Sequence, residues 1–190
     1  GYVALTKQQG AIIRNNRLVN QASKGIYLMD ERNALIEKNN ISSATTQKTD
    51  YQAIDIYRCK DELIIRNNKI NISQAYYSKG INLRSEVAGT ATQPALIYNN
   101  DISIINSPNT STYGITITDN CSNIQLYYNT VYISGTAGYA IGITGTAETM
   151  KNMVSRNNLF QNKTASPIYF FNKESQVKAY TFSHNAYLLT

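Results

Sequence analysis

The chain repeats two short segments, clearest as Ile65-Arg66-Asn67-Asn68-Lys69-Ile70 and Gly80-Ile81-Asn82-Leu83. The first places an Asn between two apolar residues. The second alternates a small residue, an apolar residue, a variable residue and a second apolar residue. Because a fixed period indicates one structural unit used many times, the repeat is interpreted before any single helix or strand.

The first segment recurs at a spacing of roughly 30 residues. Its Asn occupies seven positions: Asn16, Asn39, Asn68, Asn100, Asn129, Asn157 and Asn185. Three residues earlier stand Ile13, Ile36, Ile65, Ile97, Leu126, Val154 and Phe182. Two residues later stand Leu18, Ile41, Ile70, Ile102, Val131, Leu159 and Tyr187. Since both flanking positions are apolar or aromatic in every copy, the repeat is not a coincidence of Asn content.

The second segment recurs between the Asn positions. Its copies are Gly25-Ile26-Tyr27-Leu28, Ala53-Ile54-Asp55-Ile56, Gly80-Ile81-Asn82-Leu83, Gly114-Ile115-Thr116-Ile117, Ala140-Ile141-Gly142-Ile143 and Pro167-Ile168-Tyr169-Phe170. An apolar residue at every second position is typical of a strand with one buried face. Each repeat therefore supplies two or three short strands.

Strands this short bury their apolar side chains only when repeats stack, about 4.8 Å apart, around a shared core. The repeated Asn suits such a stack, because it tolerates a left-handed turn and its amide both donates and accepts hydrogen bonds. We therefore predict an all-β fold, a right-handed single-stranded parallel β-helix of about seven coils. It forms one domain over residues 1–190, expected to be part of a longer protein. Strand alternation also predicts one apolar column that points outward, where a partner, a loop or another domain would have to bury it. This column contains Ile12, Leu35, Ile64, Leu96 and Met153.

Leucine-rich repeats are the competing interpretation, because they also place apolar residues around an Asn at a similar period. They require a further apolar residue eight positions before the Asn, where this chain has residues such as Glu31 and Lys60. Ile-rich strands also stand where a leucine-rich repeat would place a helix. The sequence therefore favours the β-helix.

The pattern of the two segments resembles the β-helix repeats of the pectin-lyase-like superfamily, over nearly the whole chain. That superfamily includes polysaccharide lyases, polygalacturonase-type hydrolases, tailspikes, adhesins and epimerases, so the resemblance implies a fold more than a function. The Tyr- and Asn-rich segment Leu126-Tyr127-Tyr128-Asn129-Thr130-Val131-Tyr132 is also similar to secreted surface proteins of Bacteroidetes-type bacteria.

The resemblance implies that functional groups project outward from the sheet that carries the second segment. The side chains expected to bind substrate there are Tyr27, Asn82, Thr116 and Tyr169. If the chain were a metal-free lyase, Asp55, Tyr57 and Arg84 would supply its base and its carboxylate-binding groups. Because Asp55 is the one acid in these outward positions, hydrolysis by two carboxylates is not supported. A surface hydrogen-bonded cluster is the alternative interpretation of the same three residues.

No cofactor and no metal site is predicted, because the acids of this face do not cluster as calcium ligands do. His184 is the single histidine and is assigned to a turn, which argues against a zinc site or a catalytic triad. Cys59 and Cys121 follow equivalent strands two coils apart, roughly 9.6 Å by the stacking distance. A disulfide requires Cα atoms within about 7 Å, so we predict two reduced, buried thiols.

Three functions remain open: a surface module that binds polysaccharide or acts as a scaffold, a polysaccharide lyase or glycoside hydrolase acting on uronate polymers, and a protein-interaction or adhesin spacer. We expect an extracellular, cell-surface or periplasmic protein whose partners are a polysaccharide or surface glycan and neighbouring domains. Lys and Arg exceed Asp and Glu by 18 to 12, but they are scattered and no nucleic-acid-binding motif is present. No apolar run is long enough to span a membrane, and no secretory signal opens the chain.

Overall fold

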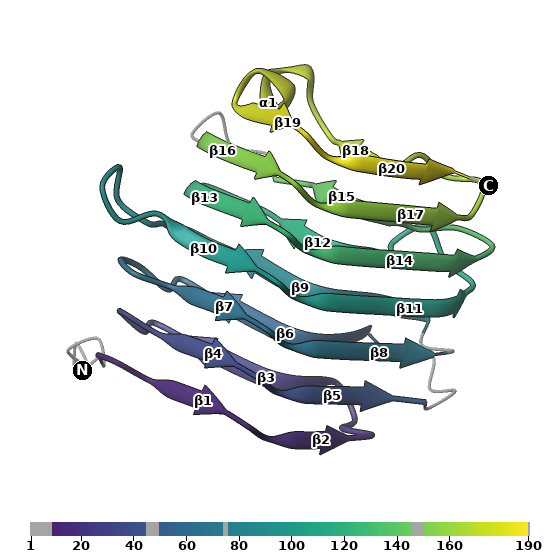
Figure 1. Ribbon diagram of the computed structural model, residues 1–190, viewed down its shortest axis with the longest axis horizontal. Helices are drawn as coiled ribbons and strands as arrows, with labels where there is room; N and C mark the ends of the chain where they lie inside the picture. The colour runs from purple at the N-terminus through teal and green to yellow at the C-terminus, as the bar shows by residue number, and fades with distance from the viewer. Residues whose placement is uncertain (1–8, 45–49, 74–75, 146–149, 190) are drawn as a thin grey trace, which may run out of the picture.

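The computed structural model describes residues 9–44, 50–73, 76–145 and 150–189, and this part of the chain forms a right-handed parallel β-helix. Three parallel sheets run along the stack, so successive coils add one strand to each sheet (Figure 1). The N-terminal and C-terminal coils lie at opposite ends of the stack. The predicted fold class is confirmed.

The strands are short and repeat in a fixed order. Sheet A contains β1 (Ile12–Arg14), β4 (Leu35–Glu37), β7 (Ile64–Arg66), β10 (Ala95–Tyr98), β13 (Ser122–Tyr127), β16 (Lys151–Arg156) and β19 (Tyr180–Ser183). Sheet B contains β2 (Arg17–Val19), β5 (Asn40–Ser43), β8 (Lys69–Ser73), β11 (Asp101–Ser107), β14 (Thr130–Gly135), β17 (Leu159–Lys163) and β20 (Ala186–Leu189). Sheet C contains β3 (Lys24–Met29), β6 (Asp50–Tyr57), β9 (Tyr77–Arg84), β12 (Tyr113–Ile117), β15 (Tyr139–Ile143) and β18 (Tyr169–Phe171). Within the described residues the last coil has no strand in sheet C, so the seven predicted coils are not all complete.

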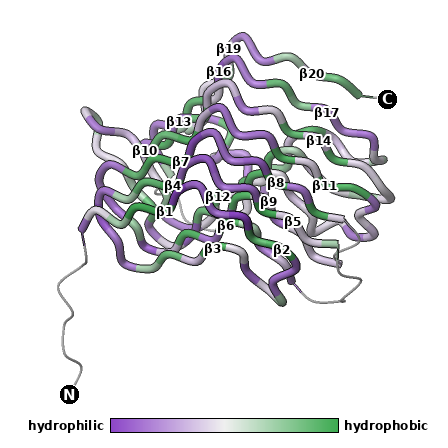
Figure 2. Tube along the Cα trace, turned by 60° about the horizontal axis from the view of Figure 1, so that its bottom comes forward, coloured by the Kyte–Doolittle hydropathy of each residue, from purple (hydrophilic) through white to green (hydrophobic). Residues whose placement is uncertain are grey.

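The core is a set of apolar columns parallel to the stack axis. In sheet C, Ile54, Ile81 and Ile115 lie over one another on successive strands and are fully buried. Figure 2 shows hydrophobic residues recurring at the same places in successive coils. Because full burial of one such side chain contributes about 1.5–3 kcal/mol, stacking supplies the stability that a single coil lacks.

An Asn ladder runs along the corner between sheets A and B. Asn39 donates from its backbone N–H and from Nδ2 to Oδ1 of Asn68, both at 3.0 Å. Asn68 makes the same two bonds to Asn100, at 3.1 and 3.0 Å. Nδ2 of Asn68 also donates to the carbonyl of Ile36, so one side chain satisfies three polar groups at a buried turn.

In each turn the residue with the left-handed backbone conformation is the one before the ladder Asn. The prediction that the repeated Asn itself adopts the left-handed turn is therefore wrong. The left-handed residues have φ between 53° and 58° and are Asn15, Lys38, Asn67, Asn99, Tyr128, Asn157 and His184. The ladder Asn is kept for its amide hydrogen bonds, while the residue before it makes the turn. His184 is a turn residue, as expected.

The prediction of Asn157 as the sixth ladder residue is wrong. Asn129 donates to Oδ1 of Asn158 at 2.8 and 3.0 Å, and Asn158 donates to Asn185 at 3.0 and 2.9 Å. Asn157 instead occupies the left-handed position, with φ 55°. Because strand side chains alternate between faces, this shift by one residue exchanges inward and outward positions on both sides of the turn.

The two apolar positions predicted for that coil are therefore also wrong. Ser155 pairs with Leu126 and Phe160 with Val131, and both are fully buried. The expected Val154 is half-buried on the outer face and the expected Leu159 is 45% exposed.

The outward apolar column exists but is shorter than predicted. Ile12 is 61% exposed at the N-terminal end, and Leu35, Ile64 and Leu96 are half-buried in register with it. Gln125 follows Leu96 and interrupts the column. The predicted member Met153 points inward and is 2% exposed.

The single helix of the described residues is α1 (Glu174–Lys178), between β18 and β19. It lies at the C-terminal end of the stack and contacts both neighbouring strands (Figure 1). Strands, not helices, follow the Asn turns, which excludes the leucine-rich repeat. No helix of the described residues is long and apolar enough to cross a membrane.

Cys59 and Cys121 are both free and buried, as predicted. Lys60 pairs with Ala88 and Ala88 with Ser122, so the two cysteines are separated by one intervening coil. Burial raises the pKa of Cys59 to about 11 and that of Cys121 to about 12. Both thiols therefore pack as small apolar groups and stay protonated near neutral pH.

Candidate functional site

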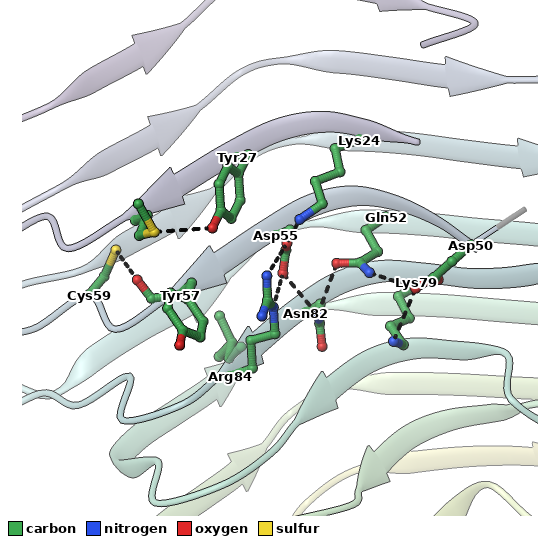
Figure 3. Close-up of polar contacts among 12 residues, drawn as sticks. Lys24, Tyr27, Asp50, Gln52, Asp55, Tyr57, Cys59, Lys79, Asn82 and Arg84 are labelled. Atoms are coloured by element: carbon green, nitrogen blue, oxygen red, sulfur yellow. Dashed lines mark hydrogen bonds and ion pairs between the residues drawn. The ribbon is translucent and has the colours of Figure 1, made fainter. Parts of the chain in front are cut away.

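The outer face of sheet C carries the predicted column of outward side chains. In register from the N-terminal end these are Tyr27, Asp55, Asn82, Thr116 and Gly142. The next outward column contains Met29, Tyr57 and Arg84. Stacking thus brings Tyr27, Asp55, Tyr57, Asn82 and Arg84 to one end of this face (Figure 3).

Asp55 is the centre of this arrangement and is fully buried. Arg84 donates to both of its oxygens, from Nε and Nη2, each at a distance of 2.9 Å. Lys24 forms an ion pair with Oδ2, and Nδ2 of Asn82 donates to Oδ1 at 2.9 Å. Both carboxylate oxygens are therefore engaged, and one anion is held between two cations. We call Asp55, Lys24, Asn82 and Arg84 the Asp55 cluster.

The Asp55 carboxylate is held in its ionised form. Burial alone would raise the pKa of Asp55, but hydrogen bonds from Arg84 and Lys24, together with their charges, outweigh burial and lower it. The hydrogen bonds to Asp55 in turn raise the pKa of Arg84. Asp55 is thus a poor proton donor, and its main effect is to fix the positions of two basic side chains.

Two tyrosine rings flank these cations. The ammonium of Lys24 lies 4.0 Å from the ring centroid of Tyr27, and the guanidinium carbon of Arg84 lies 4.5 Å from that of Tyr57. Tyr27 is 44% exposed and Tyr57 is half-buried. Cation–π contacts of this kind keep the rings and the cations together at the surface.

A third column on this face was not identified from the sequence. It contains, in register, Lys24, Gln52, Lys79, Tyr113 and Tyr139. Nδ2 of Asn82 donates to Oε1 of Gln52 at 3.0 Å, so this column is hydrogen-bonded to the Asp55 cluster. A strict period of two would give Lys24 the inward direction of Ile26, two positions later. Periodicity alone therefore did not reveal the column. Its signal is the polar residue just before each Gly or Ala of the second segment.

Asn82 and Thr116 form the floor of the face, each 1% exposed. Oδ1 of Asn82 and Oγ1 of Thr116 are buried without a hydrogen-bond partner among the described residues. The two residues are adjacent on β9 and β12. Asn82 and Thr116 were predicted to bind substrate. They lie on the expected face, but beneath the outer side chains.

Aromatic rings gather on the same face toward the C-terminal end. Tyr113 stacks on Tyr139 with centroids 5.5 Å apart, and Tyr139 lies 5.0 Å from Phe170. A Cβ at Gly142 would come within 2.3 Å of the Tyr113 ring, so the glycine leaves the space that this ring fills. We call Tyr113, Tyr139 and Phe170 the aromatic group.

Tyr169 does not point outward as predicted. It pairs with Ile141 rather than with Gly142, and it packs against the core. Burial and a hydrogen bond with Tyr187 raise the pKa of its hydroxyl above the usual range. Phe170 takes the outward position beside Gly142, because the last copy of the segment is shifted by one residue.

No group of three or more His, Cys, Asp or Glu side chains suited to a metal ion occurs within the described parts of the chain. The outer face of sheet C carries the basic groups of the Asp55 cluster, the rings of the aromatic group and the buried polar side chains of Asn82 and Thr116.

A family model described as a right-handed β-helix region matches residues 2–186. No curated protein and no solved structure matches the chain.

Proposed function

The chain belongs to the right-handed β-helix family, and on that premise we propose that it is a non-catalytic module that binds an acidic polysaccharide along the outer face of sheet C. The proposed binding surface extends from the Asp55 cluster to the aromatic group. The proposal includes an extracellular, cell-surface or periplasmic location, where such polymers are found, and neighbouring domains as further partners.

The observation that carries the proposal is the fixed pair of cations beside the exposed ring of Tyr27 and the half-buried ring of Tyr57. Lys24 and Arg84 share one buried anion, so the cluster keeps a net positive charge. Arg84 bonds to Asp55 through Nε and Nη2, and its Nη1 makes no hydrogen bond to another described residue. A carboxylate of a polymer is the natural acceptor for such a group, and the face of Tyr27 offers a sugar ring an apolar platform.

Binding is favoured over catalysis because of the state of Asp55. A general base needs to reach the proton that it removes, within about 2.6–3.2 Å. The Asp55 carboxylate is fully buried and accepts hydrogen bonds from Arg84, Asn82 and Lys24. Its role in the proposal is that of a positioning residue.

A lyase is the second candidate, and one observation favours it. Asp55, Tyr57 and Arg84 do lie together on one face, as the resemblance implies for a base and a carboxylate-binding group. In a lyase, Tyr57 rather than Asp55 would be the group with access to substrate, since it is the more exposed of the two.

The test is affinity electrophoresis in gels that contain polygalacturonate or alginate, with a neutral glucan as the control polymer. The chain is expected to be retarded by the acidic polymers only, and less so as salt is added. Tyr27→Ala should weaken retardation about tenfold in apparent Kd, while the control Tyr128→Ala, 60% exposed at the corner between sheets A and B, should leave it unchanged.

Two results would overturn the proposal: equal retardation in neutral and acidic gels, or equal losses from Tyr27→Ala and Tyr128→Ala. The same polymers are assayed for unsaturated products by absorbance. Turnover that disappears in Asp55→Ala and Arg84→Ala would replace the binding module with the lyase.

A further inference from the structure

The corner between sheets A and B carries an excess of positive charge. Basic residues that are scattered in the sequence come together there, because each coil adds one turn to the same corner. The exposed cations of the first three coils are Arg14, Arg17, Lys38 and Lys69, and Arg66 is half-buried among them. We call these five residues the basic ridge.

The charge of the basic ridge is not compensated within the described part of the chain. One acid lies at this corner in the same three coils, Glu37, which is 6% exposed and forms an ion pair with Arg66 at 2.8 Å. The other four cations form no ion pair with a described residue. The corner between sheets C and A differs, because basic residues there pair with acids of the next coil, as Arg32 does with Asp61 at 2.8 Å.

The outward apolar column runs beside the basic ridge on sheet A. Ile64 lies two residues before Arg66 on β7, so both side chains point to the outer face of the sheet. Tyr98 and Tyr127 continue the position of Arg66 in the next two coils and are half-buried. One lateral surface of the stack thus combines cations, aliphatic side chains and tyrosine rings.

This combination is typical of a surface that binds anionic membranes. Cations are attracted by the negative surface potential of acidic lipids. Apolar side chains add to binding when they enter the boundary between headgroups and acyl chains. Tyrosine rings favour the same boundary. A soluble polyanion would match the cations but would leave the apolar column in water, so the column favours a lipid surface as the partner.

We propose that the basic ridge and the outward apolar column bind this chain to an anionic lipid bilayer, with the stack axis parallel to the membrane. Both features run along the stack, so this orientation brings several coils to the lipid surface together. Sheet C lies behind sheets A and B in the view of Figure 1. Its outer face therefore stays away from the lipid, and membrane binding does not depend on polysaccharide binding.

Cosedimentation of the full chain with lipid vesicles tests the proposal. The chain should bind vesicles of equal parts phosphatidylglycerol and phosphatidylcholine, should not bind vesicles of phosphatidylcholine alone, and should bind less as salt is added. Lys38→Glu combined with Lys69→Glu should lower the partition coefficient at least about tenfold. The matched control, Arg156→Glu combined with Lys163→Glu, makes the same change in net charge at exposed positions of β16 and β17, and should lower it far less.

A second pair of variants tests the apolar column. Ile64→Ser should lower the partition coefficient about threefold, because it removes apolar surface from the contact. The control Leu159→Ser changes a leucine that is 45% exposed on β17, outside the proposed contact, and should leave partition unchanged.

Several results would overturn the proposal. They are absence of binding to the anionic vesicles, equal binding to both kinds of vesicle, equal losses in the two charge-reversal pairs, and wild-type binding by Ile64→Ser. Retardation of the Lys38→Glu and Lys69→Glu double variant in polygalacturonate gels separates a further case. If retardation falls as much as vesicle binding does, the basic ridge is a surface for soluble polyanions and not for a membrane.

Discussion

Asn157 and Asn158 show how one residue position determines the role of an amide. Asn158 is buried and bonded on both sides within the ladder, while Asn157 is exposed with φ 55°. Repeat counting selected the first of the two. The second of the paired asparagines is the ladder residue in Asn15-Asn16, Asn67-Asn68 and Asn99-Asn100 as well. In Asn39-Asn40 it is the first, so the pairs alone did not determine which amide joins the ladder.

Glycine substitution distinguishes the two positions. Asn158→Gly removes a buried donor and acceptor and leaves Asn129 without its partner, so the free energy of unfolding should fall by about 2–4 kcal/mol. Asn157→Gly should change it by less than about 1 kcal/mol, because glycine accepts a positive φ readily. Urea denaturation measures both values. Equal losses would contradict the ladder position.

Asp55 is predicted to make the fold sensitive to acid. Its pKa is lowered in the folded protein, so its contribution to stability is present above the unfolded value of about 3.9 and is lost as the pH falls through the folded value. Asp55→Asn should remove this part of the pH dependence and destabilise the protein by about 1–3 kcal/mol at pH 7, because Arg84 and Lys24 lose their shared anion.

The measurement for Asp55 is the urea midpoint from pH 3 to pH 7. Asp50→Asn is the control, because Asp50 is 48% exposed and its nearest cation, Lys79, is 3.9 Å away. A pH profile that is identical in Asp55→Asn and the wild type would refute the role assigned to the buried carboxylate.

Thr116 is predicted to be dispensable for stability. Its Oγ1 is buried without a partner among the described residues, so the isosteric Thr116→Val removes an unsatisfied group. The free energy of unfolding should stay the same or rise by up to about 1 kcal/mol. A fall in thermal stability would mean that the hydroxyl is bonded in the folded protein.

At the scale of strands, close approach between sheets explains the small residue that opens the second segment. A Cβ at Gly80 would come within 2.5 Å of the Gly114 carbonyl and of Ile102 Cγ2. Gly80→Ala should therefore lower the free energy of unfolding by about 1–3 kcal/mol. Ala140→Gly, at the equivalent position of a later strand, should lower it by only about 0.5–1 kcal/mol. Thermal unfolding of the two variants checks this order.

Strand periodicity predicted most of the fold and the centre of the site. Tyr27, Asp55 and Asn82 fall in one outward column as expected, because alternation is strict in the early copies of the segment. It failed at the last copy, where Pro167 replaces the small residue and the register moves by one. Tyr169 was therefore placed on the wrong face. The ion pair between Lys24 and Asp55 depends on side-chain reach, which periodicity does not describe.

For the molecule as a whole, the buried thiols predict low chemical reactivity. Ellman's reagent should modify neither Cys59 nor Cys121 in the folded chain at pH 8 and should modify both after denaturation. Since their pKa values are raised, their protonated forms favour the fold, and stability should decline as the pH rises above the unfolded value of about 8.5. Fast labelling of the native protein would contradict the burial of both side chains.

The direction of the backbone hydrogen bonds has a mechanical consequence. They join successive coils and so run along the stack axis. A force that pulls the two ends apart would load the bonds of an end coil first and peel coils off in turn. A force applied across the axis would be shared by many coils at once. Resistance to stretching should therefore differ with the direction of pull.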